Sequence, residues 1–176
     1  IRDFCLSRGL GDVYKRQTFI PGDAEQLSFP SGQDLIVSCS ALQWFVSPEL
    51  FFKRCNALLS GHGYFAFSTF GKENLKEIAA VTGSGLHYYS LEELKKSLSM
   101  HYNIVTAGEE RIRLTFATPL DVLYHLKHTG VTAVCRQAWT KGDLQEFCDK
   151  YAKLFSCGNA VTLTYHPLYI IARKKP

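Results

Sequence analysis

The sequence lacks the long apolar runs and the cysteine spacing that mark several protein classes. It contains no stretch of about 18 consecutive apolar residues, so we expect no membrane-spanning segment and no membrane partner. No two of its six cysteines form a C-x-x-C pair, which argues against a zinc site or a redox pair. We therefore expect reduced thiols in a cytoplasmic protein that holds no metal. The cysteines are Cys5, Cys39, Cys55, Cys135, Cys148 and Cys157.

A strong charge of one sign is also missing. The formal net charge is +4, and residues 1–17 contribute +2 of it through four basic and two acidic side chains. The remaining +2 is too small to indicate a nucleic-acid partner, which normally requires a clustered basic surface. No Ser/His/Asp or Cys/His arrangement suited to nucleophilic catalysis is evident, and we find no internal repeat or low-complexity tract.

The 176 residues, 46% of them hydrophobic, are enough for one globular domain with a substantial core. Residues 1–17 (IRDFCLSRGLGDVYKRQ) show neither helical nor strand periodicity. This segment is similar to translated sequencing-adapter sequence, and we interpret it as a non-native or disordered leader; a genuine polar leader is the alternative. A single domain is then predicted over residues 18–176.

Strands and helices alternate along that domain. Residues 34–39 form a short apolar run typical of a buried strand, and 63–70 form a second one. Between them a helix is expected, with Ser47 as its cap, Pro48 at its first position and glycines within 61–63 as its stop. Further helices are predicted over 74–81, from Ser90, over 118–127 and over 141–155, and further strands over 102–116, interrupted near 108–110, and over 159–174.

This alternation predicts an α/β fold, a three-layer sandwich with a mainly parallel sheet. The last strands follow a helical insertion and are expected to pair antiparallel. Ligands of such folds bind beyond the carboxyl ends of the strands. Residues 39–44 and 68–71 occupy those ends, so we expect the functional site there.

Several motifs resemble those of the class I S-adenosylmethionine-dependent methyltransferases. Residues 22–27 (GDAEQL), the pair Phe29-Pro30 and residues 34–37 (DLIV) are similar to the family's adenine-binding turn and the strand after it. A narrower resemblance, to the malonyl-acyl-carrier-protein O-methyltransferases, covers Phe19 to Lys175. It is carried by ALQW (41–44), GLHYYSL (85–91), LKHTGVT (126–132) and LTYH (163–166), in the family's order and spacing.

The chain departs from that family in one respect. The family's first strand, its glycine-rich turn and the acidic residue that grips the ribose have no counterpart in this sequence. Those glycines allow close backbone approach to the cofactor, and the acid fixes the ribose hydroxyls. We therefore expect an incomplete Rossmann-like domain, the C-terminal two-thirds of the parent enzyme, that alone binds the cofactor poorly and is inactive.

The resemblance implies transfer of a methyl group from S-adenosylmethionine to the free carboxylate of malonyl-acyl-carrier protein, giving the methyl ester that enters biotin synthesis. A carboxylate is ionised near neutral pH, so no general base is needed. The alternative is another class I methyltransferase that acts on a small carboxylic acid or a quinone precursor. A non-catalytic binding module is the third hypothesis.

The resemblance also implies roles for individual residues. The cofactor side would comprise Asp23, Ala24 and Glu25 at the adenine, and Cys39, Ser40 and Leu42 at the methionine portion. The acceptor would be positioned by Gln43, Trp44, His125, Lys127, Tyr165 and His166.

Purely structural roles remain open for four of these acceptor residues. Tyr165 could be a half-buried strand residue, His125 and Lys127 could belong to a solvated helix face, and His166 could mark a bend before Pro167. The expected partner is an acidic carrier protein, bound by a monomer through a basic face. Candidates for that face are Lys53, Arg54, Lys127, Arg136 and Lys141.

Overall fold

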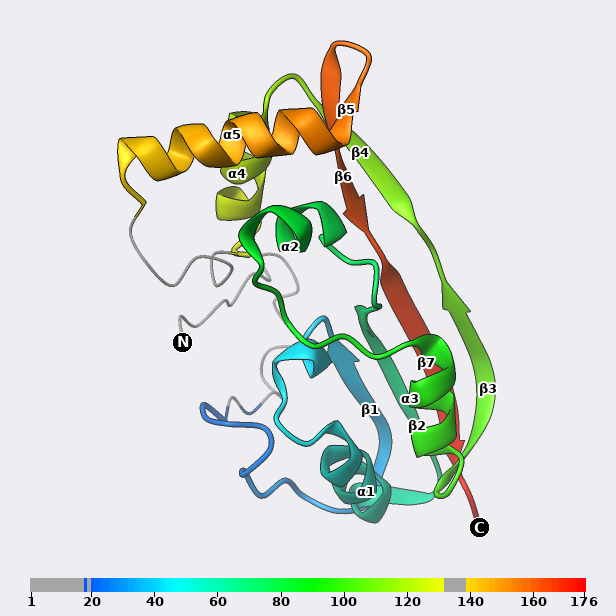
Figure 1. Ribbon diagram of the computed structural model, residues 1–176. Helices are drawn as coiled ribbons and strands as arrows, with labels where there is room; N and C mark the ends of the chain where they lie inside the picture. Colours follow the sequence, from blue (N-terminus) through cyan, green and yellow to red (C-terminus); the bar gives the residue numbers. More distant parts are fainter. Residues whose placement is uncertain (1–17, 19, 132–138) are drawn as a thin grey trace, which may run out of the picture.

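The computed structural model describes residues 18, 20–131 and 139–176, which form two β-sheets flanked by helices (Figure 1). One sheet has four strands in the order β1-β2-β7-β3, and the other has three in the order β4-β6-β5. The strands are β1 (Gln33–Cys39), β2 (Leu59–Phe70), β3 (Tyr102–Glu109), β4 (Ile112–Phe116), β5 (Ser156–Cys157), β6 (Ala160–Tyr165) and β7 (Pro167–Lys174). The helices are η2 (Leu42–Trp44), α1 (Pro48–Leu58), α2 (Lys76–Thr82), α3 (Leu91–Leu98), α4 (Pro119–His128) and α5 (Lys141–Phe155).

The four-stranded sheet is mixed. β1 and β2 are parallel, whereas β7 runs antiparallel to both of its neighbours, β2 and β3. The predicted α/β class and the antiparallel C-terminal strand are thus confirmed. Parallel pairing is limited to β1 and β2 among the described strands, so the sheet has less parallel character than the alternation suggested.

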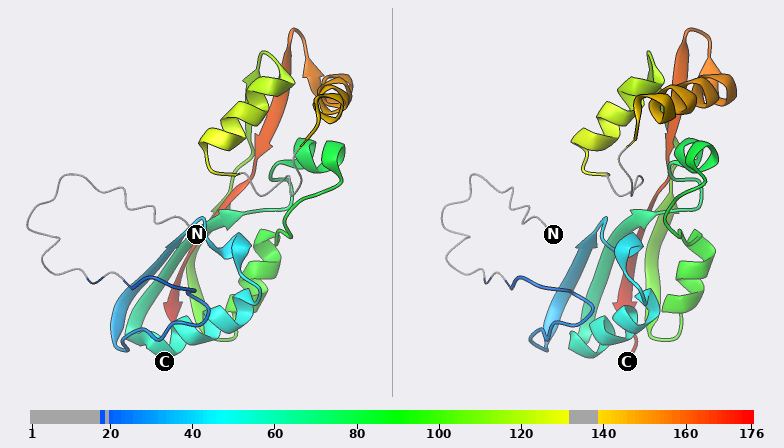
Figure 2. Two further views of the ribbon diagram at one scale, coloured as in Figure 1. Left: turned by 90° about the vertical axis from the view of Figure 1, so that its left-hand side faces the viewer. Right: turned by 60° about the vertical axis from the view of Figure 1, so that its left-hand side comes forward.

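Helices α1 and α3 cover one face of this sheet (Figure 2). Phe52 of α1 and Phe65 of β2 are almost fully buried between helix and sheet, with ring centroids 5.9 Å apart, and the Tyr102 hydroxyl donates to the Phe52 carbonyl. On the other face, strand residues that alternate with these buried ones remain exposed among the described residues. That exposed set comprises Leu35, Val37, Tyr64, Tyr169 and Ile171.

The three-stranded sheet packs against α2, α4 and α5 and encloses a second core. Leu163 of β6 is fully buried there, and Phe147 and Tyr151 of α5 lie against the same core. The Tyr151 hydroxyl donates to the Thr162 carbonyl at 2.7 Å. The predicted helix over 141–155 is therefore confirmed, with Phe147 and Tyr151 as its buried residues.

Two predicted boundaries were wrong. Helix α1 ends at Leu58, and β2 begins directly at Leu59, so the glycines at 61 and 63 lie inside the strand. A Cβ on Gly63 would come 2.8 Å from the Gln33 carbonyl oxygen, so this glycine permits close approach of β1. The strand predicted over 159–174 is divided at His166 into β6 and β7, which belong to different sheets.

Ser47 and Ser90 occupy the predicted N-cap positions, but the Ser47 side chain makes no capping hydrogen bond. Ser90 and Glu93 form a reciprocal capping box at α3, in which each side chain accepts from the other residue's backbone N–H. Thr118 with Asp121 and Thr140 with Asp143 repeat this arrangement at α4 and α5. None of the helices in the described ranges combines the length and apolar character that crossing a bilayer requires.

Candidate functional site

The site lies where β1 and β2 end, because the chain turns sharply after β1. Ser40 has a φ of 50°, in the left-handed region that disfavours residues other than glycine. Its backbone N–H donates to the Ser68 carbonyl at 3.0 Å, and this bond holds the turn against the end of β2. The turn places η2, with Gln43 and Trp44, above the carboxyl ends of both strands.

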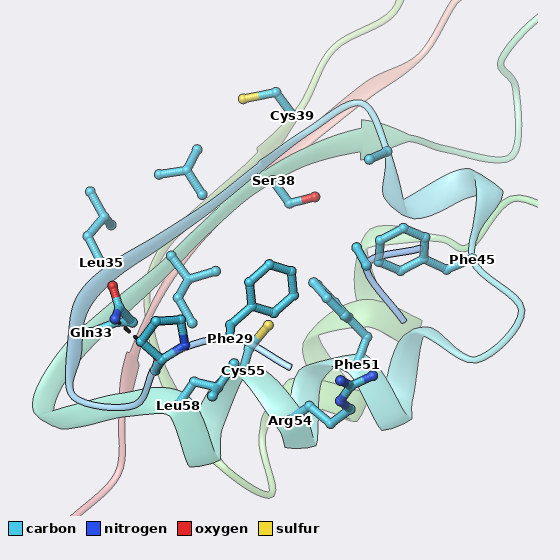
Figure 3. Close-up of a pocket in the computed structure, with 15 residues that line it drawn as sticks. Phe29, Gln33, Leu35, Ser38, Cys39, Phe45, Phe51, Arg54, Cys55 and Leu58 are labelled. Carbon is cyan, nitrogen blue, oxygen red and sulfur yellow. Dashed lines mark hydrogen bonds between the residues drawn. The ribbon is translucent and has the colours of Figure 1, made fainter. Parts of the chain in front are cut away.

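A cavity of about 460 Å³ lies beside β1, on the side that faces α1 (Figure 3). Three aromatic rings, those of Phe29, Phe45 and Phe51, contribute to its wall, together with Ala24 and Cys39. Flat apolar walls of this kind suit the faces of a purine ring. The residues present therefore fit the adenine portion of S-adenosylmethionine.

The two acidic residues predicted to bind the cofactor are engaged with the protein itself. The Asp23 carboxylate accepts from the Glu25 backbone N–H and from the Gln26 side-chain amide, both at 2.9 Å. The Glu25 carboxylate accepts from the backbone N–H groups of Val46 and Ser47, at 2.9 and 2.8 Å. Glu25 thus fixes the start of α1 against the turn that carries Asp23.

The remaining predicted cofactor residues divide into two groups. Ala24 and Cys39 line the cavity, and Ser40 lies at its strand-end border. The Leu42 side chain is only 2% exposed and belongs to the first hydrophobic core, which leaves its backbone alone for any ligand.

A second cavity, of about 560 Å³, lies between η2 and α2. Trp44 forms part of its wall and is half exposed, and Tyr88 and Asn74 line it as well. Lys72 and Lys76 contribute the charged side chains of this lining, which contains no carboxylate among the described residues. Each lysine is also paired with a glutamate outside the cavity, Glu93 and Glu73 respectively. An anionic ligand in this cavity would therefore share the two ammonium groups with these glutamates.

Gln43 supports the wall that carries Trp44. Its side-chain amide donates to the Ser40 carbonyl at 2.6 Å, and its carbonyl oxygen accepts from the Thr69 hydroxyl at 3.2 Å. These bonds tie η2 to the ends of both β1 and β2.

The structure brings together two other predicted acceptor residues, His125 of α4 and Tyr165 of β6. His125 Nε2 lies 2.9 Å from the Tyr165 hydroxyl oxygen. Burial raises the pKa of Tyr165; a hydrogen bond with Thr129 opposes this rise and the nearby Tyr88 adds to it. The pair therefore forms a partly buried hydrogen bond beside the second core.

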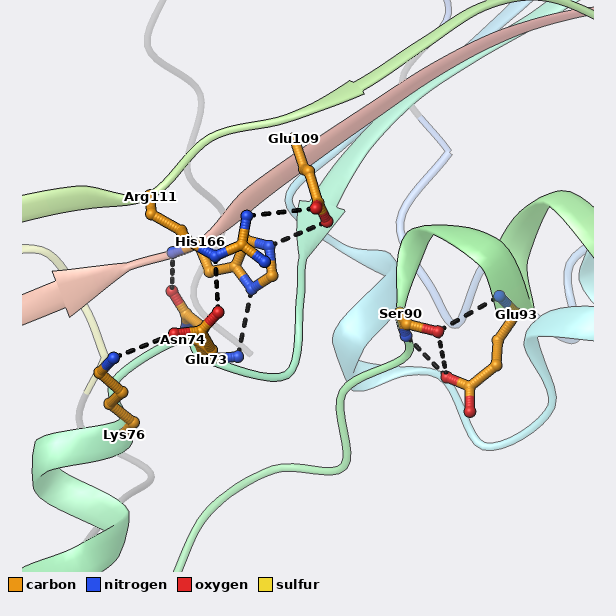
Figure 4. A network of polar contacts seen from close by, with 8 residues as sticks. All are labelled: Glu73, Asn74, Lys76, Ser90, Glu93, Glu109, Arg111 and His166. Atoms are coloured by element: carbon orange, nitrogen blue, oxygen red, sulfur yellow. Dashed lines mark hydrogen bonds and ion pairs between the residues drawn. The ribbon is translucent and has the colours of Figure 1, made fainter.

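His166 lies elsewhere, in the buried junction between the two sheets (Figure 4). Its Nδ1 accepts from the Glu73 backbone N–H, and its Nε2 lies 3.1 Å from a Glu109 carboxylate oxygen. Since Nδ1 accepts a hydrogen bond, it is unprotonated, and the hydrogen on Nε2 is donated to Glu109. The ring is 3% exposed, with both nitrogens occupied, so this arrangement supports the bend interpretation over acceptor positioning.

The predicted basic residues do not gather around either cavity. Lys127 is exposed on α4 and lines neither of them, and Lys141 begins α5. Arg54 turns inward and donates to the Leu27 carbonyl, whereas its neighbour Lys53 is exposed. Arg136 is outside the described residues. In the part of the chain that the structure describes, no cluster of three or more His, Cys, Asp or Glu side chains could hold a metal ion.

Sequence reasoning missed Tyr88, Asn74, Lys72 and Lys76 as cavity residues. Tyr88 stands within the GLHYYSL motif, so its position was marked without a role. The other three belong to a stretch that the pattern identified only as the approach to α2, and nothing in that pattern shows which side chains face η2.

The fold and the family comparisons agree on the class of protein. The BH2331 protein of Bacillus halodurans C-125 shares the fold, with a TM-score of 0.59 at 16% identity over 88% of this chain and 70% of that one. The family model described as "Methyltransferase domain" matches residues 6–67, and so begins within the predicted leader. The chain belongs to the class I methyltransferase family.

Closely similar relatives define the branch of that family. A malonyl-[acyl-carrier protein] O-methyltransferase of Bacteroides thetaiotaomicron is 56% identical over 171 residues, covering 92% of this chain and 66% of the relative. One of Bacteroides fragilis is 57% identical over 179 residues, covering 99% of this chain and 36% of the relative. The chain thus spans less than two thirds of the length of each of these relatives.

Proposed function

We propose that this chain is part of an enzyme that transfers a methyl group from S-adenosylmethionine to the free carboxylate of malonyl-acyl-carrier protein. The product would be the methyl ester that enters biotin synthesis. The observation that carries the proposal is the pair of cavities on either side of η2, one walled by aromatic rings and the other lined by two lysines. The identity to the two Bacteroides relatives supports the choice of acceptor.

The cofactor side of the proposal rests on the aromatic cavity. Phe29, Phe45 and Ala24 would pack on the adenine, with Asp23 at its edge, and the backbone at Cys39, Ser40 and Leu42 would face the methionine portion. S-adenosylmethionine supplies an electrophilic methyl group when it is bound. The Asp23 carboxylate would have to exchange its bond to Gln26 for one to the adenine amino group, while its bond to the Glu25 N–H keeps the turn in place.

On the acceptor side, the protein would have to position the malonyl carboxylate, and no general base is needed. An ionised carboxylate attacks directly, so the task of the protein is to hold the acceptor in line with the methyl group and to exclude water. Alignment of this kind contributes up to roughly 7–11 kcal/mol in the best-oriented reactions. Trp44, held by Gln43, would form the wall at this point, and the His125–Tyr165 pair would border the acceptor side.

The proposal extends to the partner and its location. The malonyl group would arrive as a thioester on an acidic carrier protein in the cytoplasm. Lys53, Lys127 and Lys141 would contribute to the docking face of a monomeric enzyme. Their separation on α1, α4 and α5 makes this a diffuse surface, whose attraction would be screened by salt.

We also propose that residues 1–17 are a non-native leader and that residues 18–176 belong to a single methyltransferase domain. Peptide mapping of the protein isolated from its source tests this directly. Recovery of peptides from residues 1–17, contiguous with the domain, would refute the leader proposal.

The function is tested by labelled methyl transfer with the full-length gene product that carries this chain. Malonyl-acyl-carrier protein, free malonate and a quinone precursor are offered separately, each with labelled S-adenosylmethionine. Label should appear in the carrier-protein fraction and be released by mild base, as expected for a methyl ester. Transfer confined to the small molecules would favour the alternative methyltransferase.

A further inference from the structure

The segment between α2 and α3 presents alternate side chains to two different cavities. Leu86 and Tyr88 line the cavity between η2 and α2. His87 and Tyr89 line a separate groove between α1 and α3. This alternation is that of an extended chain, and it directs the Tyr88 ring to the same side as the cavity lysines.

The amide of Asn74 fixes the hydrogen-bonding state of Tyr88. Asn74 is only 5% exposed, and its side-chain oxygen accepts from the His166 backbone N–H at 3.2 Å. A backbone N–H can only donate, so the orientation of this amide is determined. Its Nδ2 must then donate to the Tyr88 hydroxyl oxygen, 3.1 Å away.

This arrangement leaves the hydroxyl hydrogen of Tyr88 available. A phenol that accepts from an amide donates its own hydrogen elsewhere, and among the described residues no second partner lies within bonding distance. Burial raises the pKa of Tyr88, which keeps the hydroxyl protonated and therefore a donor at neutral pH. The hydroxyl thus acts as a pre-oriented donor in the wall of the cavity.

The charged residues of the cavity bear on the ligand group that would accept this hydrogen. Lys72 and Lys76 are its charged lining residues among those described, and each is paired with a glutamate outside the cavity, so an anionic ligand would share their ammonium groups with Glu93 and Glu73. Trp44 lies on the same wall and connects this cavity to the strand ends where the methyl donor is proposed to bind.

We propose that Tyr88 binds the acceptor carboxylate by donating its hydroxyl hydrogen to a carboxylate oxygen, and that Asn74 is the positioning residue that directs this donation. The inference rests on the proposed function and names a determinant of its specificity. The hydroxyl would distinguish a malonyl group, which has a free carboxylate, from an acetyl group, which has none.

The test compares Tyr88→Phe with Tyr89→Phe in the full-length gene product. Both changes remove one phenolic hydroxyl from neighbouring residues, but Tyr89 faces the other groove. A hydrogen bond to a charged group predicts a loss of about 10- to 100-fold in kcat/KM for malonyl-acyl-carrier protein in Tyr88→Phe. Tyr89→Phe should retain its activity.

A second measurement separates carboxylate recognition from a general structural effect. Acetyl-acyl-carrier protein, used as a competitive inhibitor, should bind Tyr88→Phe and the unaltered protein equally, because it lacks the recognised group. Asn74→Asp keeps the acceptor for the His166 N–H but replaces the donor to Tyr88, so it should lower kcat/KM in the same direction. Asn74→Asp is the variant to use if Tyr88→Phe has a lowered melting temperature.

Each outcome has a distinct meaning. Unchanged kcat/KM in folded Tyr88→Phe, or equal weakening of malonyl and acetyl carriers, would overturn the role of Tyr88 and leave the proposed function standing. If the unaltered full-length protein does not methylate malonyl-acyl-carrier protein, the proposed function fails, and the inference fails with it.

Discussion

The two sheets of this molecule are connected where β3 leads into β4 and β6 leads into β7, but they differ in how their faces are covered. The four-stranded sheet has helices on one face and exposes Leu35, Val37 and Ile171 on the other, within the described residues. The three-stranded sheet is packed by α2, α4 and α5, and its middle strand β6 is almost wholly buried. The first sheet provides the strand ends at which the fold binds ligands. The second holds α2, which forms one wall of the cavity between η2 and α2.

The junction explains how the two sheets stay in register. β3 continues into β4 and β7 follows β6, and both connections pass beside His166. The His166 ring, the Glu109 carboxylate and the Glu73 backbone join three separate segments at this point. The placement of α2 relative to the strand ends of the first sheet therefore depends on the contacts at this junction.

The largest effect on stability should come from truncating a large buried side chain in either core. Phe65→Ala in the first sheet should reduce the free energy of unfolding by about 3–5 kcal/mol, and Leu163→Ala in the second by about 2–5 kcal/mol. Both side chains are fully buried. Denaturant unfolding of the full-length protein, followed by fluorescence and circular dichroism, measures both. Val46→Ala, at a residue 90% exposed, is the control.

That experiment also tests how separate the sheets are. If the two behave as one cooperative unit, either substitution should shift a single transition seen equally by both probes. Two resolved transitions, with each variant moving only one, would show that the sheets fold independently.

Removal of the buried carboxylate of Glu77 should have the next largest effect. Glu77 of α2 is 2% exposed and accepts from both the backbone N–H and the hydroxyl of Thr164 in β6. Glu77→Ala leaves a buried N–H unpaired and should cost about 3 kcal/mol. Glu146→Ala removes an exposed carboxylate paired with Lys150 and should cost under about 1 kcal/mol. Equal costs in the two variants would contradict the proposed anchoring of α2.

The junction itself is tested by adding a methyl group. A Cβ at Gly71 would lie 2.6 Å from the His166 ring, so Gly71→Ala should destabilise the fold by about 1–3 kcal/mol. Gly61→Ala places the same group where nothing lies within 4 Å, and provides the matched control in thermal melts. A Gly71→Ala variant as stable as the control would show that the His166 ring can move without cost.

Acid should weaken the junction slightly. Hydrogen bonds from Arg111 and Lys76 lower the pKa of Glu73 to about 2, and His166, followed by Arg111, lowers that of Glu109. A carboxyl whose folded pKa lies below its unfolded value stabilises the fold above the unfolded pKa, and that contribution disappears as the pH falls toward the folded one. The thermal unfolding midpoint should therefore decrease as the pH is lowered from about 4.5 to about 2. This decrease should be less steep in Glu73→Gln. An unchanged slope in that variant would argue against the network.

Much of the fold could be predicted because local chemistry dictates it. The three capping boxes and the proline at the start of α1 mark helix starts in the sequence itself. A bend at His166 was an open interpretation because Pro167 follows it, but the assignment of the two halves to different sheets could not be predicted, since the strand pattern continues through His166. The start of β2 could not be predicted either. Gly63 comes after a helical pattern and indicates the end of a helix, but in the structure it allows the close approach of Gln33.

The site was only partly predictable for a related reason. Motifs at the strand ends indicated Trp44 and Gln43, because loops beyond parallel strands carry ligands in this fold class. They did not indicate Asn74 or Lys72, which reach the cavity through the placement of α2 over η2. That placement depends on Glu77 and Thr164, which are 87 residues apart in the chain.

The most direct test of the account is the intact mass of the carrier protein after incubation of the full-length gene product with S-adenosylmethionine. Malonyl-acyl-carrier protein should gain the mass of one methyl group in place of a proton, and acetyl-acyl-carrier protein, which has no free carboxylate, should gain nothing. Modification of both carriers would place the methyl group somewhere other than the carboxylate. Modification of neither, by an enzyme that still methylates a small acid, would contradict the proposed acceptor.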